Sequence, residues 1–299
     1  MDFLVVGAQK CSTSWLYNCL RDHPEMHLPP KKLEKVYLGG DLHNENDDSW
    51  YRDFVGGQGT GLIKGDVSVD YLIDPRSPEV VRETVGPVKI IASLRDPVDR
   101  AVSAYFWNLR QGHVQALDPS EGLYRAVKVW KERSPVTSYE SENYHYNLVA
   151  RGMYGEQLQR YLDVFGRELV YIVYYEDILK RPVDTLQSLY SALHVASDFE
   201  PSSLFRRPKQ NSYLRPLLRV ERATPNSALL GKVTDLANRI LCHLGLGNEK
   251  PSLSPKVKNA LQSLYEPSNE RLKELVQELP RSNVVARENP TPPWIDTTS

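Results

Sequence analysis

A lysine and several hydroxyl residues follow the first apolar run of the chain directly. Residues 3–6 are Phe-Leu-Val-Val, a pattern typical of a buried strand, and a helix-like run begins near Trp15. Between the two runs lie Lys10, Ser12, Thr13 and Ser14. A helix N-terminus offers unpaired amides and the positive end of a dipole, and a lysine adds charge-assisted hydrogen bonds. The spacing therefore predicts a loop that binds a phosphate or a sulfate group.

This loop is not a Walker A motif. That motif, Gly-x-x-x-x-Gly-Lys-[Ser/Thr], has a glycine directly before its lysine. Here Gln9 precedes Lys10, and Gly7 lies further upstream. Taken alone, the segment has an ordinary alternative, which is a strand-to-helix turn with a solvated lysine.

A second segment strengthens the phosphate-loop interpretation. The strand-like run 88–94 ends in Arg95 and Asp96, and Pro97 favours the start of a helix there. Arg95 is then at the carboxyl end of a strand and Ser103 about two turns along the helix. Both side chains face the crevice in which open α/β sheets bind nucleotides. The alternative is a surface pair of Arg95 with Asp96, which the presence of both segments in one chain disfavours.

Together the two segments resemble the sulfotransferases that use 3′-phosphoadenosine 5′-phosphosulfate (PAPS). Residues 10–14 are similar to their 5′-phosphosulfate loop, Lys-x-Gly-Thr-[Thr/Ser], and residues 94–103 match their 3′-phosphate motif, Leu-Arg-[Asn/Asp]-Pro-x-x-Arg-x-x-Ser. A third stretch, 151–178, looks like the later core of the carbohydrate and bacterial branches. The resemblance covers roughly residues 1–280.

The resemblance implies that PAPS is the sulfuryl donor and that both motifs bind it. Lys10 would also act on the leaving group, the loop would hold the 5′-phosphate, and Arg95 with Ser103 would hold the 3′-phosphate. A basic loop at 206–213 is similar to one that closes over the nucleotide in these enzymes. The implied donor-binding set is Lys10, Cys11, Ser12, Thr13, Ser14, Trp15, Arg95, Ser103, Arg207, Lys209 and Asn211.

Glu34 is the general base that the resemblance implies. It stands at the Glu of the family segment Pro-x-x-Lys-Glu-x-x-[Phe/Tyr]-[Phe/Leu], although Leu33 replaces the lysine. The alternative is one charge in a solvated Lys/Glu run. His23 and His27 come next, since the cytosolic branch uses a histidine. An amine acceptor that arrives deprotonated would need no base.

Two departures from the family pattern bear on the loop and on the acceptor. Ser12 replaces the usual glycine, which implies that its backbone does not require a conformation open only to glycine. Residues 66–71 replace the Glu-Lys-[Thr/Ser]-Pro-x-Tyr segment of glycosaminoglycan-modifying relatives, with Val67 at the lysine position. That difference argues against a heparan-type acceptor. The candidate acceptor-side residues are Ser68, Asp70 and His27.

Composition narrows the function classes. The 37 basic and 38 acidic residues nearly cancel, so charge gives no case for nucleic-acid binding. Three cysteines and seven histidines without paired spacing predict neither a disulfide framework nor a metal site. No secretory signal or membrane-length apolar run is evident, so we expect a cytoplasmic enzyme without a membrane partner.

We therefore expect metal-free, in-line transfer of the sulfuryl group from PAPS to a hydroxyl of a small metabolite. Sulfation of a poly- or oligosaccharide is the first alternative. A small-molecule kinase would share the fold but would need Mg²⁺ ligands and a Walker A loop. A non-catalytic nucleotide- or sulfate-binding protein would keep the loop and need no base.

The alternation of strands and helices predicts an α/β fold with a P-loop-like central parallel sheet flanked by helices on both faces. We expect one sulfotransferase domain over 1–285, a loop at 39–60, and an irregular C-terminal tail over 286–299 that Trp294 pins to the body. Strands are expected at 3–7, 62–68, 88–94 and 169–174. Helices are expected at 13–22, 77–85, 97–110, 142–150, 153–165, 182–193, 226–243, 254–265 and 267–278.

Overall fold

The computed structural model describes residues 1–29, 48–56, 61–133, 143–205 and 253–295, with seven further residues between 217 and 241. At its centre is a five-stranded sheet in the order β2-β3-β1-β4-β5, in which every neighbouring pair is parallel. The strands are β1 (Phe3–Gly7), β2 (Met26–His27), β3 (Ile63–Val67), β4 (Lys89–Leu94) and β5 (Val170–Tyr174). This confirms the predicted fold class.

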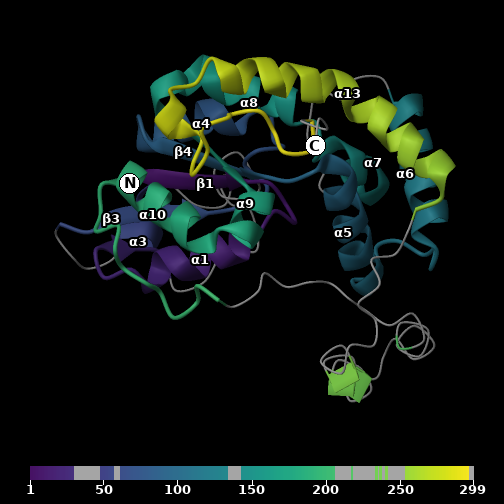
Figure 1. The fold of residues 1–299 in the computed structure, drawn as a ribbon, viewed down its shortest axis with the longest axis horizontal. Coiled ribbons are helices and arrows are strands. Elements are labelled where there is room, and N and C mark those ends of the chain that lie inside the picture. The colour runs from purple at the N-terminus through teal and green to yellow at the C-terminus, as the bar shows by residue number, and fades with distance from the viewer. Residues whose placement is uncertain are drawn as a thin grey trace.

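Helices cover both faces of the sheet (Figure 1). They are α1 (Thr13–Asp22), α3 (Asp48–Gly56), α4 (Ser77–Val85), α5 (Pro97–Arg110), α6 (Pro119–Glu132), α7 (Tyr144–Ala150), α8 (Tyr154–Phe165), α9 (Tyr175–Lys180), α10 (Pro182–Leu193) and α13 (Pro255–Gln277). Helices α4, α8 and α13 lie over one face, α1 and α10 over the other, and α5, α6 and α7 form a helical layer beside the sheet.

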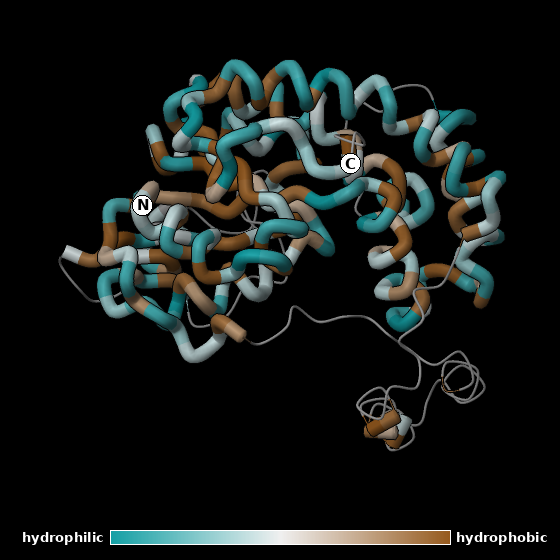
Figure 2. Tube along the Cα trace, in the orientation of Figure 1, coloured by the Kyte–Doolittle hydropathy of each residue, from teal (hydrophilic) through white to brown (hydrophobic). Residues whose placement is uncertain are grey.

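Strand β1 shows why the sheet is covered on both faces. Successive side chains of a strand point to opposite faces. Leu4 and Val6 therefore pack with α8 and α13, whereas Phe3 and Val5 pack with α1 and α10. All four are fully buried, and the apolar centre of the sheet stands out in Figure 2.

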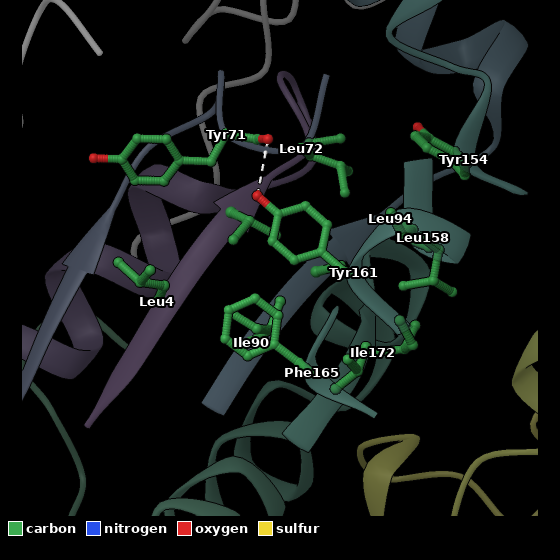
Figure 3. Packing of buried hydrophobic residues seen from close by; sticks show 14 of the residues in the cluster. Leu4, Tyr71, Leu72, Ile90, Leu94, Tyr154, Leu158, Tyr161, Phe165 and Ile172 are labelled. Carbon is green, nitrogen blue, oxygen red and sulfur yellow. Dashed lines mark hydrogen bonds between the residues drawn. The ribbon is translucent and has the colours of Figure 1, made fainter. Parts of the chain in front are cut away.

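The first of these two cores is aromatic. Figure 3 shows Tyr161 and Phe165 of α8 among Leu4, Ile90 and Ile172 of the sheet. The Tyr161 hydroxyl donates to the carbonyl of Tyr71 at 2.9 Å. That bond ties α8 to the segment that follows β3.

The elements that position the helical layer were only partly predicted. Tyr51 and Val55 pack α3 into the first core, so the loop expected at 39–60 is wrong over Asp48–Gly56. The two helices expected at 254–265 and 267–278 are one helix, α13, with Pro267 inside it. A proline there removes one hydrogen bond, and packing of α13 along α8, α5 and α6 compensates. The sequence analysis did not predict β2, α6 or α9, and the helix expected at 226–243 lies largely outside the described residues.

The C-terminal segment contacts the body of the protein. Residues 286–295 form no helix or strand. The ring of Trp294 packs against Tyr174 and Tyr154, with centroids 5.5 and 6.2 Å away, and its Nε1 donates to Asn269 Oδ1 at 3.2 Å. The predicted attachment by Trp294 is confirmed, while the division into one domain and a tail stays a prediction.

Two kinds of feature are absent from the described ranges. No helix there is long and apolar enough to cross a lipid bilayer. In the same ranges, no group of three or more His, Cys, Asp and Glu side chains is arranged to hold a metal ion.

Candidate active site

The topology places the two predicted phosphate motifs side by side. The chain leaves β1 through α1 toward β2 and β3, and later leaves β4 through α5 on the other side. β1 and β4 are neighbours in the sheet, so their carboxyl ends border the crevice where open α/β sheets bind ligands. The loop with Lys10 and the turn with Arg95 meet at this crevice.

Strand β4 holds the loop that follows β1. The amide of Ala8 donates to the carbonyl of Ser93 at 2.7 Å, and the Ser93 hydroxyl donates to the carbonyl of Cys11 at 2.5 Å. The Cys11 sulfur lies 3.7 Å from the Tyr154 hydroxyl of α8. Burial raises the pKa of the Cys11 thiol to about 11, so at neutral pH this thiol is an uncharged packing group.

The segment that follows β3 packs against the start of the loop, on the side away from β4. Gly7 has φ 151°, and a Cβ at this position would lie 2.9 Å from Leu72 Cβ. The amide of Leu72 donates to the carbonyl of Val6 at 2.8 Å. A glycine is therefore needed where the segment after β3 presses against the loop.

The backbone of the loop is left-handed at two residues that are not glycine. Lys10 has φ 71° and Ser12 has φ 65°, and both values lie in the region that favours glycine. This conformation is uncommon for serine but is not open to glycine alone, so it agrees with the expectation for Ser12 and adds some backbone strain. Ser12 is the N-cap of α1 but makes no capping bond, and its Oγ is buried without a hydrogen-bond partner.

The predicted loop amides do not all point toward a ligand here. The amide of Cys11 donates to the Ala8 carbonyl at 3.3 Å, and that of Trp15 to the Ser12 carbonyl at 2.9 Å. Thr13 is buried and Ser14 exposed in the first turn of α1. In an α-helix the first-turn amides have no partner within the helix, which is the condition for anion binding.

Arg95 is oriented by an aromatic ring. Its side chain is only 12% exposed, and its guanidinium lies over the ring of Tyr175, 4.3 Å from the centroid. Nη2 contacts Asp99 Oδ2 at 3.5 Å, whereas the buried Nε has no hydrogen-bond partner. Ser103 is half-buried, and because it follows Asp99 by four residues it lies on the same side of α5 as the end of the Arg95 side chain.

Two partly buried carboxyl groups fix the turn that carries Arg95. Asp96 Oδ1 accepts from the amides of Val98 and Asp99 at 2.8 and 2.9 Å and so caps α5. The Asp96 amide in turn donates to Glu176 Oε1 at 3.2 Å. Burial raises the pKa of both carboxyl groups.

The candidate acceptor-side residues Ser68 and Asp70 are both engaged by the protein. The Ser68 amide donates to the carbonyl of Val5 at 3.0 Å, and its hydroxyl accepts from the Asp70 amide at 3.4 Å. Asp70 is ion-paired with Arg151, whose Nη1 donates to the Val69 carbonyl at 3.2 Å. Local turn bonds and one ion pair thus place both residues beside the loop.

Asp66 anchors this acceptor-side segment to the sheet. It is buried at the end of β3 and accepts from the hydroxyls of Tyr51 and Tyr71 at 2.9 and 3.0 Å. Desolvation by burial raises the pKa of Tyr51 well above its ordinary value, so the hydroxyl stays protonated and donates. This cluster was not predicted because Tyr51 belongs to α3, the helix that sequence reasoning missed.

The histidines lie elsewhere. His27 in β2 pairs with Lys64, three residues before the end of β3, which is about 10 Å along the strand from the crevice edge. His23 is buried between Tyr190 and Phe199, its Nδ1 accepts from the Glu25 amide at 3.1 Å, and its Nε2 donates to the carbonyl of Ala196 at 2.9 Å. Its ring nitrogens are thus occupied in a structural role.

Four predicted residues, Glu34, Arg207, Lys209 and Asn211, lie outside the described residues. The described residues just before the basic loop contact α1, because Trp15 Nε1 donates to the carbonyl of Leu204 at 3.0 Å. Leu204 comes three positions before Arg207, so this segment passes beside the first turn of α1.

Sequence reasoning missed Tyr175, Ser93 and Tyr154. The signal for Tyr175 was present: it follows a predicted strand, and the register pairs Leu94 with Tyr174, so Arg95 and Tyr175 leave adjacent strands together. Ser93 and Tyr154 act through contacts between distant segments, for which the sequence has no local pattern.

The comparisons with known proteins all point to one family. The family model for the sulfotransferase domain matches residues 1–212. The crystal structure of a sulfotransferase from Alicyclobacillus acidocaldarius is similar, with a TM-score of 0.64 and 26% identity over 92% of this chain and 95% of that one.

Curated relatives are more distant. Bifunctional heparan sulfate N-deacetylase/N-sulfotransferase 4 of Mus musculus is 23% identical over 98% of this chain but only 31% of its own length. Heparan sulfate glucosamine 3-O-sulfotransferase 5 of Mus musculus is 21% identical over 70% of this chain and 58% of its own length. The chain thus spans less than two thirds of either relative. Since the family model matches residues 1–212 of 299, the chain belongs to the sulfotransferase family.

Proposed function

We propose that this protein transfers the sulfuryl group of PAPS to a hydroxyl group of a small metabolite. The observation that carries the proposal is the meeting of the Lys10 loop and the Arg95 turn at the ends of adjacent strands. A donor with charged groups at its 5′ and 3′ positions matches two separate cationic sites at one crevice.

Polar atoms without partners support this fit. Ser12 Oγ and Arg95 Nε are buried and make no hydrogen bond with the residues that the structure describes, which is costly unless a ligand supplies the partner. The guanidinium of Arg95 is pre-oriented by Tyr175, and its fork of N–H groups suits a phosphate. The 5′-phosphosulfate is assigned to the loop and the 3′-phosphate to Arg95 and Ser103.

The reaction is an in-line displacement at sulfur. A bond forms between the acceptor oxygen and sulfur while the bond from sulfur to the bridging oxygen breaks. The electron pair goes to the 5′-phosphate of the product adenosine 3′,5′-bisphosphate, and the acceptor proton goes to a base. Positioning and charge neutralisation supply most of the catalysis. Lys10 neutralises the leaving group, and Glu34 takes the proton.

The role of Glu34 has a direct test. Glu34→Gln keeps the shape and removes the proton acceptor, so kcat should fall by ~10²–10⁴-fold while PAPS binding stays unchanged. Lys35→Gln, one residue away, serves as the control. Turnover within a few-fold of wild type would place the base elsewhere, with Asp70 and His27 next, or would mean that the acceptor is an amine.

A saccharide hydroxyl is the second candidate acceptor. The relatives described above are heparan sulfate enzymes by name, which favours it. The end of β3 differs from such enzymes, because the apolar Val67 is buried where they carry a lysine. Arg151, on the Val69 carbonyl, puts a different cation near this segment.

Labelled PAPS with an acceptor panel tests the proposal as a whole. The panel holds small alcohols, phenols, amines, monosaccharides and heparan-type oligosaccharides. Label transfer to small alcohols or phenols supports the metabolite acceptor, and transfer to oligosaccharides alone replaces it with the second candidate. Transfer to no acceptor, together with phosphorylation from ATP and Mg²⁺, would favour a kinase.

A cytoplasmic location and one domain over 1–285 complete the proposal. Cys11 and Cys19 are both buried free thiols, as suits a reducing compartment. Fractionation of cells that express the chain tests the location, and limited proteolysis tests the single domain.

A further inference from the structure

Arg100 is a buried charge to which the sequence analysis gave no role, although it is the second arginine of the 94–103 motif. Its side chain on α5 is 0% exposed. Nη2 donates to the carbonyl of Leu148, whereas Nε and Nη1 have no hydrogen-bond partner. Among the residues that the structure describes, no carboxylate oxygen lies within 4.0 Å of the guanidinium.

An arginine cannot avoid the free-energy cost of burying its charge by losing its proton. Desolvation of an unpaired ion is strongly unfavourable, and proteins normally offset it with a nearby opposite charge. Asp96 is one turn earlier on the same helix, but its Oδ1 faces the amides of Val98 and Asp99. The positive charge of Arg100 is thus not neutralised by an ion pair inside the described protein.

The charge lies one helical turn after the turn that carries Arg95, because the Arg100 amide donates to the carbonyl of Asp96 at 2.8 Å. Arg100 shares the Leu148 carbonyl with the hydroxyl of Tyr265, which is 3.4 Å from it. Cys11 of the loop points inward to Tyr154. Burial dominates the raised pKa of the Cys11 thiol and of the Tyr154 hydroxyl, and the positive charge of Arg100 acts on both in the opposite direction. The first turn of α5 thus puts the guanidinium near the Arg95 turn, and its charge also acts on the groups packed behind the loop.

We propose that Arg100 is a buried counter-charge for the bound nucleotide, raising the affinity for PAPS and its product through the loop without touching either. The phosphates of the ligand supply the negative charge that the fold lacks at this place. Arg100 is on this view a positioning and electrostatic residue, distinct from the contacts of Lys10 and Arg95. The inference rests on the proposed function only in taking an anionic nucleotide as the ligand.

The competing explanation is purely structural. Arg100 would then serve to satisfy the Leu148 carbonyl and hold α5 to α7. That role predicts that its replacement destabilises the free protein and leaves ligand affinity of the folded fraction unchanged. The counter-charge predicts the reverse, because removal of an unpaired buried ion relieves its desolvation. The Tyr265 hydroxyl, 3.2 Å from the carbonyl of Val149 and 3.4 Å from that of Leu148, remains beside this end of α7.

Arg100→Met and Arg100→Lys in the full chain distinguish the counter-charge role from the purely structural role. The ligands are adenosine 3′,5′-bisphosphate, adenosine 5′-monophosphate and uncharged adenosine, measured by calorimetry or competition. We expect Arg100→Met to weaken the bisphosphate about tenfold or more, because it removes an attraction between opposite charges across a medium less polar than water. The monophosphate should weaken less and adenosine not at all. Arg100→Lys keeps the charge and should retain most of the affinity.

Arg160→Met is the matched control. Arg160 is also largely buried, has an unpartnered Nε, and donates to the carbonyls of Leu72 and Ile73 at 3.3 and 3.2 Å. Its loss should lower the melting temperature without selecting among ligands by their charge.

Three results would overturn the inference: unchanged bisphosphate affinity in Arg100→Met, an equal loss for adenosine, or a loss in Arg100→Lys as large as in the methionine variant. If Arg100→Met does not fold, Arg100→Gln takes its place, because it also removes the charge but can still donate to the carbonyl of Leu148. Wild-type protein that fails to bind the bisphosphate would instead count against the proposed function.

Discussion

Lys10 and Arg95 hold different parts of the same ligand in the proposed complex, and substitution should separate them. Arg95 contacts a phosphate that stays unchanged during the reaction, so Arg95→Ala should raise KM for PAPS and leave kcat nearly unchanged. Lys10 meets charge that grows in the transition state, so Lys10→Ala should lower kcat by about 10²–10³-fold. Steady-state kinetics with varied PAPS measure both.

Arg82→Ala provides the control for these two variants. Arg82 is exposed on α4 and lies away from both motifs in sequence. Kinetics in which Arg95→Ala lowers kcat and Lys10→Ala changes only KM would mean that the two sites are exchanged.

Substitution of Ser12 should change the stability of the ligand-free protein. Its left-handed backbone is unfavourable for a residue with a Cβ, and its buried hydroxyl has no partner. Ser12→Gly should therefore stabilise the ligand-free protein by about 1 kcal/mol, or one to two degrees in melting temperature for a chain of this size. Calorimetry without ligand checks it, and a lower melting temperature would show that the hydroxyl stabilises the free loop.

At the scale of elements, α8 and α13 pack closely against each other at Gly155. A Cβ there would lie 2.5 Å from the backbone oxygen of Ser268 and 2.8 Å from Arg271 Cβ. The Gly155 amide also donates to Ser268 Oγ at 3.0 Å. Gly155→Ala should force the helices apart and destabilise the protein by about 1–3 kcal/mol, as expected of overpacking.

Gly56→Ala is the matched control for that substitution. Gly56 ends α3, has no positive φ, and a Cβ added to it would meet no atom within 4 Å. The control should leave the denaturation midpoint unchanged or raise it slightly, since alanine favours a helix. Equal midpoints for Gly155→Ala and wild type would show that α13 shifts at no cost.

Local pattern sufficed for the elements that carry the two motifs. β-branched runs and Pro97 mark β1, β4 and α5, and parallel strand ends meet at one edge, so Lys10 and Arg95 were predicted together. Helix α3 escaped prediction because it is short and stands between stretches rich in Gly, Asp and Asn, although Tyr51 and Val55 recur at helical spacing. The continuity of α13 through Pro267 depends on packing against distant helices, which no local window contains.

The details of the site depend on long-range contacts for the same reason. Tyr175 under Arg95 follows from strand register, and Ser93 on the Cys11 carbonyl follows from the fold of the loop. The left-handed backbone at Ser12 is set by what surrounds the loop, because serine seldom adopts this conformation by itself.

At the scale of the whole molecule, α13 joins the sheet to the helical layer that contains α5. It packs along α8 over the sheet and reaches α5 and α6 (Figure 1). The proposed nucleotide would bridge the loop before α1 and the turn before α5. A bound nucleotide would therefore connect this loop and this turn directly, whereas within the protein they are joined through the core and α13.

That arrangement predicts a large effect of the nucleotide on stability. A ligand that binds only the folded state at about 100 times its dissociation constant adds roughly 2.7 kcal/mol. For a chain of this size this corresponds to a rise of about 4 °C in melting temperature. We expect this rise with adenosine 3′,5′-bisphosphate and a smaller one with adenosine 5′-monophosphate at the same concentration, because the latter leaves Arg95 without its phosphate.

EDTA should change neither the shift in melting temperature nor the rate of sulfuryl transfer, since Lys10 and the loop amides supply the positive field. A shift that appears only with ATP and Mg²⁺, or transfer that EDTA abolishes and a divalent metal restores, would contradict the proposed donor site.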